Sequence, residues 1–533
     1  MRLIGFLFVL AGFAAPLAAQ TNTAPAARQL SLQDCLQLAI RNNLDLHVAR
    51  FDAALPVFTL SAAYGAYDPT LSLSGQHERS ESGTQLVAGS ILTSGRITDA
   101  NSFSSSLEGL LPWGTTYSLA SSVSDTYGTS ATTRDNLAQP TLITNSFVNL
   151  TDGKPITYIT TNYGQVPARS PFESSSGSAS VSLTQPLLKN FWIDSARLSI
   201  RVAKNRLKYS EQTLRLQIMQ TITKVEQAYY DWIYNLENVR VQEKAVELAE
   251  RLVTENRKKV EVGSLAPLDE KNAESQAASS RATLIAARSS LAVQEATLKQ
   301  YISAEYSSWA EAPLRPSEAL SAPRQFFNLR DSWSKGLTLR PEILQARLDL
   351  EQAGIQLKYN RNQLYPELDL FGTVGYNGSG REFSDALYDI QQTDRPYYIY
   401  GGQLKMPLVR TAARNNYRSQ KTVVEQSLMN VKVMERNIMF AIDTDIRQAQ
   451  SSYEQVGATR AAREYAEAAL DAEQKKLESG KSTTYTVLQM QRDLTTARGN
   501  EIQALANYNK NLSALSLDEG TTLDRLRVNL EVK

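Results

Sequence analysis

The chain has 533 residues, of which 42% are hydrophobic and 21% charged, and its formal net charge is +1. This balance argues against a nucleic-acid-binding protein, which would have basic stripes. Only two histidines occur, His47 and His77, and no phosphate-binding loop or nucleophile elbow follows a predicted strand. We therefore expect no enzyme activity, no metal site and no cofactor, and interpret His77 as an interfacial residue.

The first residues predict a secretory signal peptide over 1–20. Arg2 supplies the positive start, Leu3 to Leu10 the apolar run and Ala11 to Gln20 the small residues, with cleavage near Ala19 or Gln20. The single cysteine, Cys35, lies beyond this segment in a helical pattern. It is therefore expected to be a small packing residue, and an internal disulfide is excluded.

After the signal peptide, no stretch reaches the roughly 18 to 20 consecutive apolar residues of a membrane-spanning helix. A secreted chain without such helices can still enter a membrane by building a closed barrel. The next segment, Ser31 to Ala66, has the apolar spacing of a helix, which Pro56 is expected to break or kink. Tyr67-Asp68-Pro69 then ends the helix and opens a strand.

The same order of elements occurs twice. Pro69 and Pro366, which each open a strand, lie 297 residues apart, and Asn328 to Leu364 forms the second preceding helix. Farther on, Pro186 and Pro407 are 221 apart, and the turn glycines Gly263 and Gly480 are 217 apart. The drop from 297 to 221 means that the first half contains about 76 extra residues. We therefore predict two structural repeats, 21–327 and 328–533.

Alternating apolar and polar residues predict four strands of about 9 to 11 residues, the length of a tilted membrane strand. They begin near Thr70, Ser178, Glu367 and Tyr398. Aromatic residues near their ends suit membrane-interface girdles: Tyr67, Trp113, Tyr117, Tyr365, Tyr397 and Tyr398. The alternative, the edge of a soluble β-sandwich, is less favoured because so few strands could not bury a face.

The extra residues of the first half contain a further hairpin over 101–124, turning at Pro112-Trp113-Gly114-Thr115. This hairpin either joins the other strands or lies outside them. The following residues, Ser124 to Ser176, are rich in Ser, Thr, Asn and Tyr without a period, and predict a long exposed loop.

Very long helices follow the strands. Asp194 to Val262 contains neither proline nor glycine and would reach about 100 Å as one helix. Apolar residues alternate at steps of four and three, a coiled-coil spacing, and Leu268 to Ile302 returns. The second repeat predicts the same pair at Thr411 to Leu477 and Thr484 to Leu515. The hairpins therefore span 194–302 and 410–515, the first being followed by an irregular segment, 303–327, and the second by a C-terminal segment.

Several motifs together resemble the TolC family of outer-membrane efflux and secretion channels. They are Leu32-x-x-Cys35-Leu36, Tyr67-Asp68-Pro69, Gln185-Pro186-Leu187-Leu188 and the two turns, Val260 to Asp269 and Leu477 to Tyr485. The resemblance implies an α+β membrane protein that forms a homotrimer in the cell outer membrane. Four strands per protomer would form a shared antiparallel twelve-stranded β-barrel, or an eighteen-stranded one if the 101–124 hairpin joined, continued by a coiled-coil α-barrel in the periplasm.

The resemblance also implies partners and sites. The helical tips would dock a periplasmic adaptor (membrane fusion) protein of an inner-membrane pump; these tips are Val262, Gly263, Ser264, Leu265, Ser479, Gly480, Lys481 and Ser482. Transport would be passive conduction for a tripartite efflux pump or a type I secretion system, which the sequence does not separate. Family members often close the periplasmic end with acidic residues, whereas the matching positions here are the neutral Thr486 and Gln489. We therefore hypothesise a gate in which Asp269 pairs with Lys481.

A different class of protein, a periplasmic coiled-coil adaptor or scaffold without a channel, is the alternative. Adaptors usually have one helical hairpin rather than two, and they would need neither repeated membrane-length strands nor a polar 50-residue loop. The channel interpretation is therefore favoured.

Overall fold

The computed structural model describes residues 28–83, 85–87, 91–93 and 95–526. The predicted signal peptide lies outside the described residues. The chain forms two compact units, each assembled from parts of both halves of the sequence. We call residues 54–209 with 346–431 the sheet unit, and the remaining described residues the helical unit. The helices α2 (Leu44–Tyr64), α3 (Ser195–Glu261), α7 (Pro341–Asn362) and α9 (Thr411–Glu478) each have residues in both.

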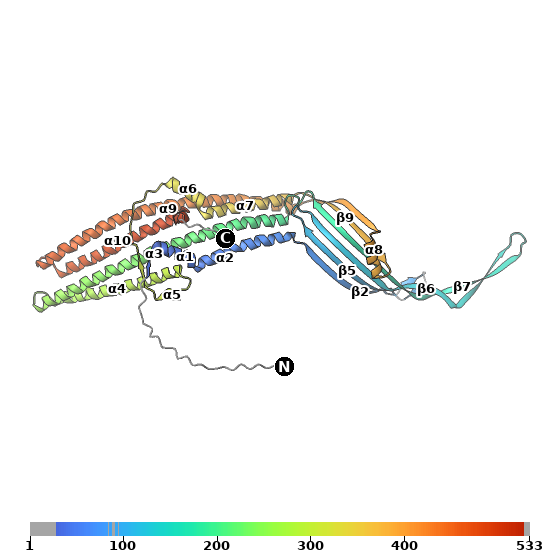
Figure 1. Ribbon diagram of the computed structural model, residues 1–533, viewed down its shortest axis with the longest axis horizontal. Helices are drawn as coiled ribbons and strands as arrows, with labels where there is room; N and C mark the ends of the chain where they lie inside the picture. The colour runs from blue at the N-terminus through green and yellow to red at the C-terminus, as the bar shows by residue number, and fades with distance from the viewer. Residues whose placement is uncertain (1–27, 84, 88–90, 94, 527–533) are drawn as a thin grey trace, which may run out of the picture. The chain divides into compact units, whose positions relative to one another are not determined.

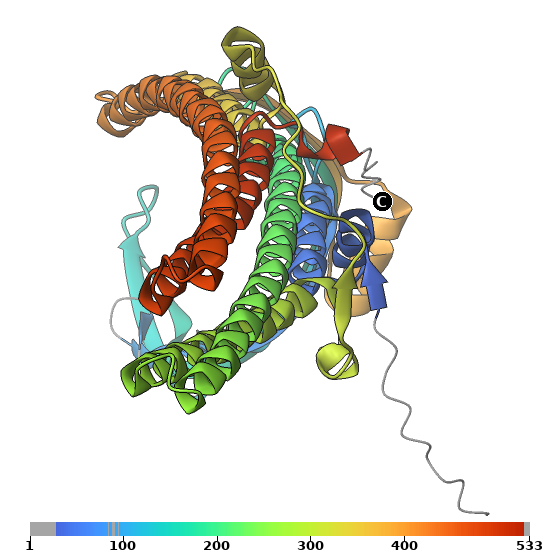
Figure 2. The ribbon, with the colours of Figure 1, turned by 90° about the vertical axis from the view of Figure 1, so that its left-hand side faces the viewer.

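The helical unit contains two long hairpins, as predicted. In the first, α3 is followed by α4 (Pro267–Ile302); in the second, α9 is followed by α10 (Thr484–Asp518). Figure 2 views the hairpins from the end of their turns, the first in green and the second in orange to red. The bounds match the predicted ones to within three residues at each end, because uninterrupted heptad-like spacing leaves little choice of secondary structure.

The main core of the helical unit lies where α3 meets α1 (Leu32–Asn42) and the end of α4. Tyr229, Trp232 and Leu298 are fully buried there, and Cys35 packs against the same cluster. Burial raises the pKa of the Cys35 thiol to about 12. The prediction that Cys35 is a packing residue is confirmed.

The first helical segment breaks at Asn43 rather than at Pro56, which lies inside α2. Asn43 has extended backbone angles, and its side chain accepts a hydrogen bond of 3.2 Å from the Leu46 amide while donating one of 3.0 Å to the Tyr301 carbonyl. It therefore ends α1 and caps α2 at once. The matching break in the second half follows α6 (Leu329–Leu339), at Arg340.

The segment 303–327 is less irregular than predicted. It contains the short helix α5 (Ser307–Ala310) and the strand β8 (Leu314–Pro316), which pairs in parallel with β1 (Arg28–Leu30). At the other end of the described chain, α11 (Thr522–Leu526) follows α10.

The sheet unit contains a six-stranded antiparallel sheet (Figure 1). Its strands are β2 (Thr70–Glu81), β5 (Ile97–Leu110), β6 (Thr116–Val148), β7 (Pro155–Pro186), β9 (Glu367–Gly380) and β10 (Pro396–Lys405), in the order β10-β9-β7-β6-β5-β2. The 101–124 hairpin thus joins the sheet, as β5 and the start of β6, between β2 and β7. Most strands exceed the predicted 9 to 11 residues. A small separate ladder joins β3 (Gln85–Val87) to β4 (Ile91–Thr93).

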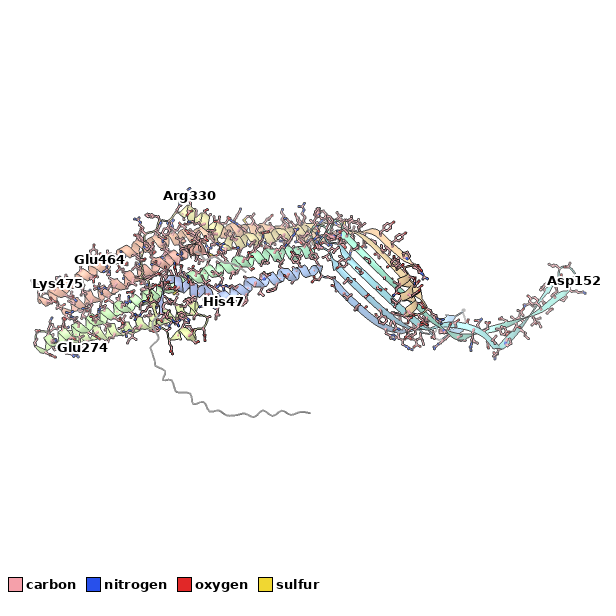
Figure 3. The ribbon with its side chains drawn as sticks, in the orientation of Figure 1. His47, Asp152, Glu274, Arg330, Glu464 and Lys475 are labelled. Carbon is pink, nitrogen blue, oxygen red and sulfur yellow. The ribbon has the colours of Figure 1, made fainter. Side chains whose placement is uncertain are left out.

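The predicted loop over 124–176 is wrong. β6 and β7 continue as a paired ribbon from Thr116↔Thr184 out to Val148↔Pro155, with one register shift between Asp135 and Pro140. Asp152, labelled in Figure 3, lies in the turn that joins them. Cross-strand pairing satisfies the backbone groups of these polar residues, and serine and threonine are tolerated because neither face of the ribbon has to form a core.

A short helix that the sequence did not predict, α8 (Phe383–Gln392), packs on the sheet. The Ile390 side chain lies against Gly177 and Gly378, and the ring of Phe383 meets that of Phe103 at 5.8 Å between centroids. The two glycines leave the space that the isoleucine fills, since a Cβ at Gly177 would lie 2.8 Å, and one at Gly378 2.7 Å, from carbons of the Ile390 side chain.

In the described part of the chain, no helix is both long and apolar enough to span a membrane. The same residues contain no group of three or more His, Cys, Asp or Glu side chains suited to a metal ion.

Candidate functional site: sheet faces and helical tips

One face of the sheet carries an apolar row that crosses all six strands. Residues directly opposite each other on neighbouring strands share a face, so the register defines rows across the sheet. One such row is Leu71, Leu107, Leu119, Val181, Val374 and Tyr398. Several of these side chains are exposed, Leu71 by 65% and Val374 by 59%. An apolar row left uncovered in a single chain needs an apolar environment.

The opposite face consists largely of hydroxyl side chains. The neighbouring row is Ser72, Ser106, Ala120, Ser180, Gly375 and Tyr397. Hydroxyl pairs cross the strands on this face, Ser74 with Ser104 at 2.7 Å and Ser182 with Thr373 at 2.9 Å between oxygens. A sheet with one apolar face and one hydroxyl-rich face separates a lipid-like phase from water.

The predicted girdle residues lie on or beside this sheet. Tyr67, Trp113 and Tyr365 lie just outside strand ends, Trp113 and Tyr365 being exposed, and Tyr117 is the second residue of β6. Tyr398, in contrast, belongs to the apolar row, where its ring stacks with that of Tyr400 at 6.5 Å. His77 lies in β2, four residues beyond Leu73, and shares a 2.8 Å hydrogen bond with the side chain of Asn101, its partner on β5.

The two helical tips have the same backbone geometry. Gly263 and Gly480 have φ angles of 71° and 74°, the left-handed conformation that glycine adopts without strain. In the first tip the Ser264 amide donates to the Lys259 carbonyl at 2.9 Å, and in the second the Lys481 amide donates to Lys476, also at 2.9 Å. Both are Schellman endings, which close α3 and α9 before the chain reverses.

Exposed apolar side chains surround these turns. Val262 is 77% exposed and Leu268 69% at the first tip, and Tyr485 is 68% exposed at the second. Ion pairs lie beside them, such as Lys271 with Glu274 at 2.7 Å and Lys475 with Asp471 at 2.6 Å; Figure 3 labels Glu274 and Lys475. Of the other predicted tip residues, Leu265 and Ser482 are half-buried, and the Ser482 hydroxyl donates to Glu473.

The predicted gate residues lie just beyond the turns. Asp269 and Thr486 occupy the first turns of α4 and α10, 217 residues apart, while Lys481 and Gln489 are exposed. Thr486 belongs to the helix cap, because its amide donates to the Thr483 hydroxyl at 3.3 Å. No ion pair joins Asp269 to Lys481 within the single chain over the described ranges. The hypothesised pairing between neighbouring hairpins stays a prediction.

Sequence reasoning missed a link between the two hairpins. The Arg492 guanidinium on α10 donates a hydrogen bond of 2.6 Å to the Gln276 side chain on α4. Both residues line a polar groove whose other walls include Ser280, Thr283 and Thr495. No motif marks this pair, since it depends on which faces of the two return helices meet.

Comparison with known proteins agrees with this geometry. The family model described as outer membrane efflux protein matches residues 157–304 and 334–517. The outer membrane efflux protein BepC of Brucella suis biovar 1 (strain 1330) is 24% identical over 332 residues, covering 62% of this chain and 68% of that protein.

Solved structures share the fold. The CmeC outer membrane channel of Campylobacter jejuni matches with a TM-score of 0.62 at 14% identity, covering 97% of this chain and 94% of that one. The outer membrane protein VceC of Vibrio cholerae matches with a TM-score of 0.62 at 15% identity, covering 92% and 96%. The resemblance seen in the sequence motifs is confirmed. Because the family model matches more than half of the chain, including both helical hairpins and their tips, this chain belongs to the outer membrane efflux protein family.

Proposed function

We propose that three copies of this chain form the outer-membrane exit duct of a tripartite efflux pump or a type I secretion system. The duct conducts substrates passively to the exterior, and an inner-membrane pump supplies the energy. The sheet supports this proposal most directly, because its apolar face suits lipid and its serine-rich face suits a water-filled channel. The helical hairpins would continue the channel through the periplasm.

The experiment is single-channel conductance of the detergent-extracted protein in a planar bilayer, beside its mass in solution. Discrete conductance steps from a species of three chains are expected. A water-soluble monomer without conductance would contradict the duct and favour a periplasmic adaptor or scaffold. If a trimer shows no conductance, adding the adaptor is expected to open it, and continued silence would also reject the proposal.

The helical tips are the proposed docking surface for the periplasmic adaptor. The exposed Val262, Leu268 and Tyr485 side chains would bury apolar area against that partner. Tyr485→Asp should abolish co-purification with the adaptor, as well as efflux. The matched control is Tyr465→Asp, because Tyr465 is at least as exposed, by 77%, but lies on α9 away from the turn.

For the closed state, we propose that Asp269 of one hairpin pairs with Lys481 of a neighbouring protomer's hairpin. Both residues lie at or beside the tips, where Thr486 and Gln489 offer no charge. Replacing Asp269 and Lys481 with alanine should raise single-channel conductance. An unchanged closed state in this double variant would reject the pairing.

A further inference from the structure

The sheet has two free edges. In the described residues, β2 pairs only with β5 and β10 pairs only with β9, so each presents a row of unpaired backbone amides and carbonyls. In hydrocarbon every such unpaired group costs several kcal/mol. For an outer-membrane protein with this apolar face, both edges must therefore find strands to pair with.

The strand ends show how the sheet is staggered. Following one row from Thr70 across the sheet leads through Glu108, Ser118, Ser182 and Thr373 to Ile399. Thr70 is the first residue of β2, yet β10 continues past Ile399 for six more residues, to Lys405. The intermediate strands end progressively farther along, at Leu110, Pro186 and Glu367. The strand ends that lie next to the helices, which we call the helix-proximal ends, are therefore shifted along the strand direction by six residues in total between β2 and β10.

This stagger is the one that a tilted barrel requires. The rise along a strand is about 3.3 Å per residue, and neighbouring strands are about 4.7 Å apart. A shift of one residue between neighbouring strand ends therefore corresponds to a strand tilt of about 35°. Membrane barrels have strand tilts of roughly 35 to 45°. If the helix-proximal strand ends lie at one level around the barrel, Lys405 of one copy lies beside Thr70 of the next.

We propose that β10 of one protomer pairs antiparallel with β2 of the next, Lys405 opposite Thr70, and that three protomers of six strands close an eighteen-stranded barrel. This inference rests on the trimer of the proposed function. Because barrel diameter grows roughly linearly with strand number, the barrel is about 1.5 times as wide as one built from four strands per protomer.

The side chains at the two edges fit this register. Leu71 lies opposite Leu404 on the apolar face, and Ser72 lies opposite Gln403 on the polar face. A slip by one residue would mix the two faces. Tyr398 and Tyr400, which are 74% and 82% exposed at the β10 edge, lie opposite His77 and Gly75. Gly75 has no side chain of its own on this face, where the Phe103 ring of β5 lies against it, so the tyrosine of the neighbouring protomer would add a second ring beside Phe103.

Disulfide cross-linking in membranes tests the register, in a Cys35→Ala background and with a mild oxidant. The variant Ser72→Cys with Gln403→Cys should give linked species of two and three chains on non-reducing gels. The control, Ser72→Cys with Tyr397→Cys, joins residues of the same row and should give no interchain link. Cross-linking of the control but not of the first variant would overturn the proposed register. Linked species of two chains without any of three chains would overturn the closed barrel of eighteen strands.

A second pair of variants tests whether β5 and β6 lie within the barrel wall. Ser72→Cys with Ser106→Cys should link within the chain, since these residues are paired neighbours. Ser72→Cys with Ser180→Cys should not, because three strand spacings, about 14 Å, exceed the roughly 7 Å that a disulfide spans. Linking of Ser72 to Ser180 would place β2 beside β7 and overturn the inference. A conducting trimer in that case would leave the proposed function standing.

Discussion

Arg492 of α10 donates a 2.6 Å hydrogen bond to Gln276 of α4, and this contact ties the return helix of one hairpin to that of the other. Separating the hairpins near their tips would require breaking it. Arg492→Ala should therefore favour the open tip. Losing a hydrogen bond of about 1 kcal/mol corresponds to a roughly fivefold increase in open probability. Single-channel recordings of the variant and the parent would measure this change.

The control for this prediction is Arg498→Ala on the same helix. Arg498 pairs with Glu467 at 2.7 Å, and Glu467 lies on α9, within its own hairpin. Its loss should leave open probability unchanged. Equal opening by both variants would show a general loosening of α10 rather than release of the link between hairpins.

The half-buried carboxyl pair Asp445–Asp518 makes stability depend on pH. Burial, followed by the neighbouring Asp518 carboxylate, raises the pKa of Asp445 to about 7, although Arg340 lies close enough to oppose the shift. Between about pH 4 and 7 the folded protein therefore holds a proton that the unfolded chain releases. The free energy of unfolding should fall as the pH rises through this window.

Asp445→Asn should remove that dependence. At pH 8 the variant should be more stable than the parent by about 1 kcal/mol, allowing for solvent screening of a half-buried group. The difference should vanish near pH 4. Unfolding transitions measured at a series of pH values check the prediction, and a constant difference at all pH values would contradict it.

Glu226 on α3 is almost fully buried and accepts a hydrogen bond from the guanidinium of Arg525 on α11. Arg525→Ala would leave a buried carboxylate without its cation. Because Arg525 is itself 39% exposed, the loss should be smaller than the about 3 kcal/mol that removing one partner of a fully buried pair costs, but the melting temperature should still fall. Adding Glu226→Gln to this variant should recover part of the loss, because the uncompensated charge disappears. No recovery would mean that Arg525 stabilises by packing alone.

The two faces of the sheet should respond differently to charge. Val374→Arg places a cation on the apolar face and should cost about 2 to 4 kcal/mol, lowering the amount of assembled protein in the outer membrane. Thr373→Arg, one residue earlier, places the same cation on the hydroxyl-rich face and should preserve assembly while changing conductance and ion selectivity. The quantity of membrane-inserted protein measures assembly, and the reversal potential measures ion selectivity. The reverse pattern would exchange the lipid and lumen faces.

The sequence predicted the structure correctly where one pattern of residues, such as a hydrophobic period, continued over many positions. The hairpins over 195–302 and 411–518 follow from long runs without glycine or proline, and the tips follow from Gly263 and Gly480. The membrane strands near Ser178 and Glu367 follow from alternation of apolar and polar residues. In each case the local pattern and the fold demand the same structure.

The sequence did not predict the structure where contacts between residues far apart in the chain determine it. The polar residues from Ser124 to Ser176 have no apolar period, and only pairing of β6 with β7 makes them strands. Asn43 ends a helix through a contact with Tyr301, far along the chain. The Arg492–Gln276 link likewise joins residues 216 apart, so no local signal could identify it.

The pair β5 and β6 lies between β2 and β7 without reversing the direction of either. A hairpin is the smallest addition to an antiparallel wall that keeps every later strand running the same way and every later side chain facing the same phase. Single strands could not be added in this manner, since the next helix would then start from the wrong side of the membrane. Wall circumference in such proteins can therefore evolve in steps of two strands per subunit, which symmetry multiplies around the ring.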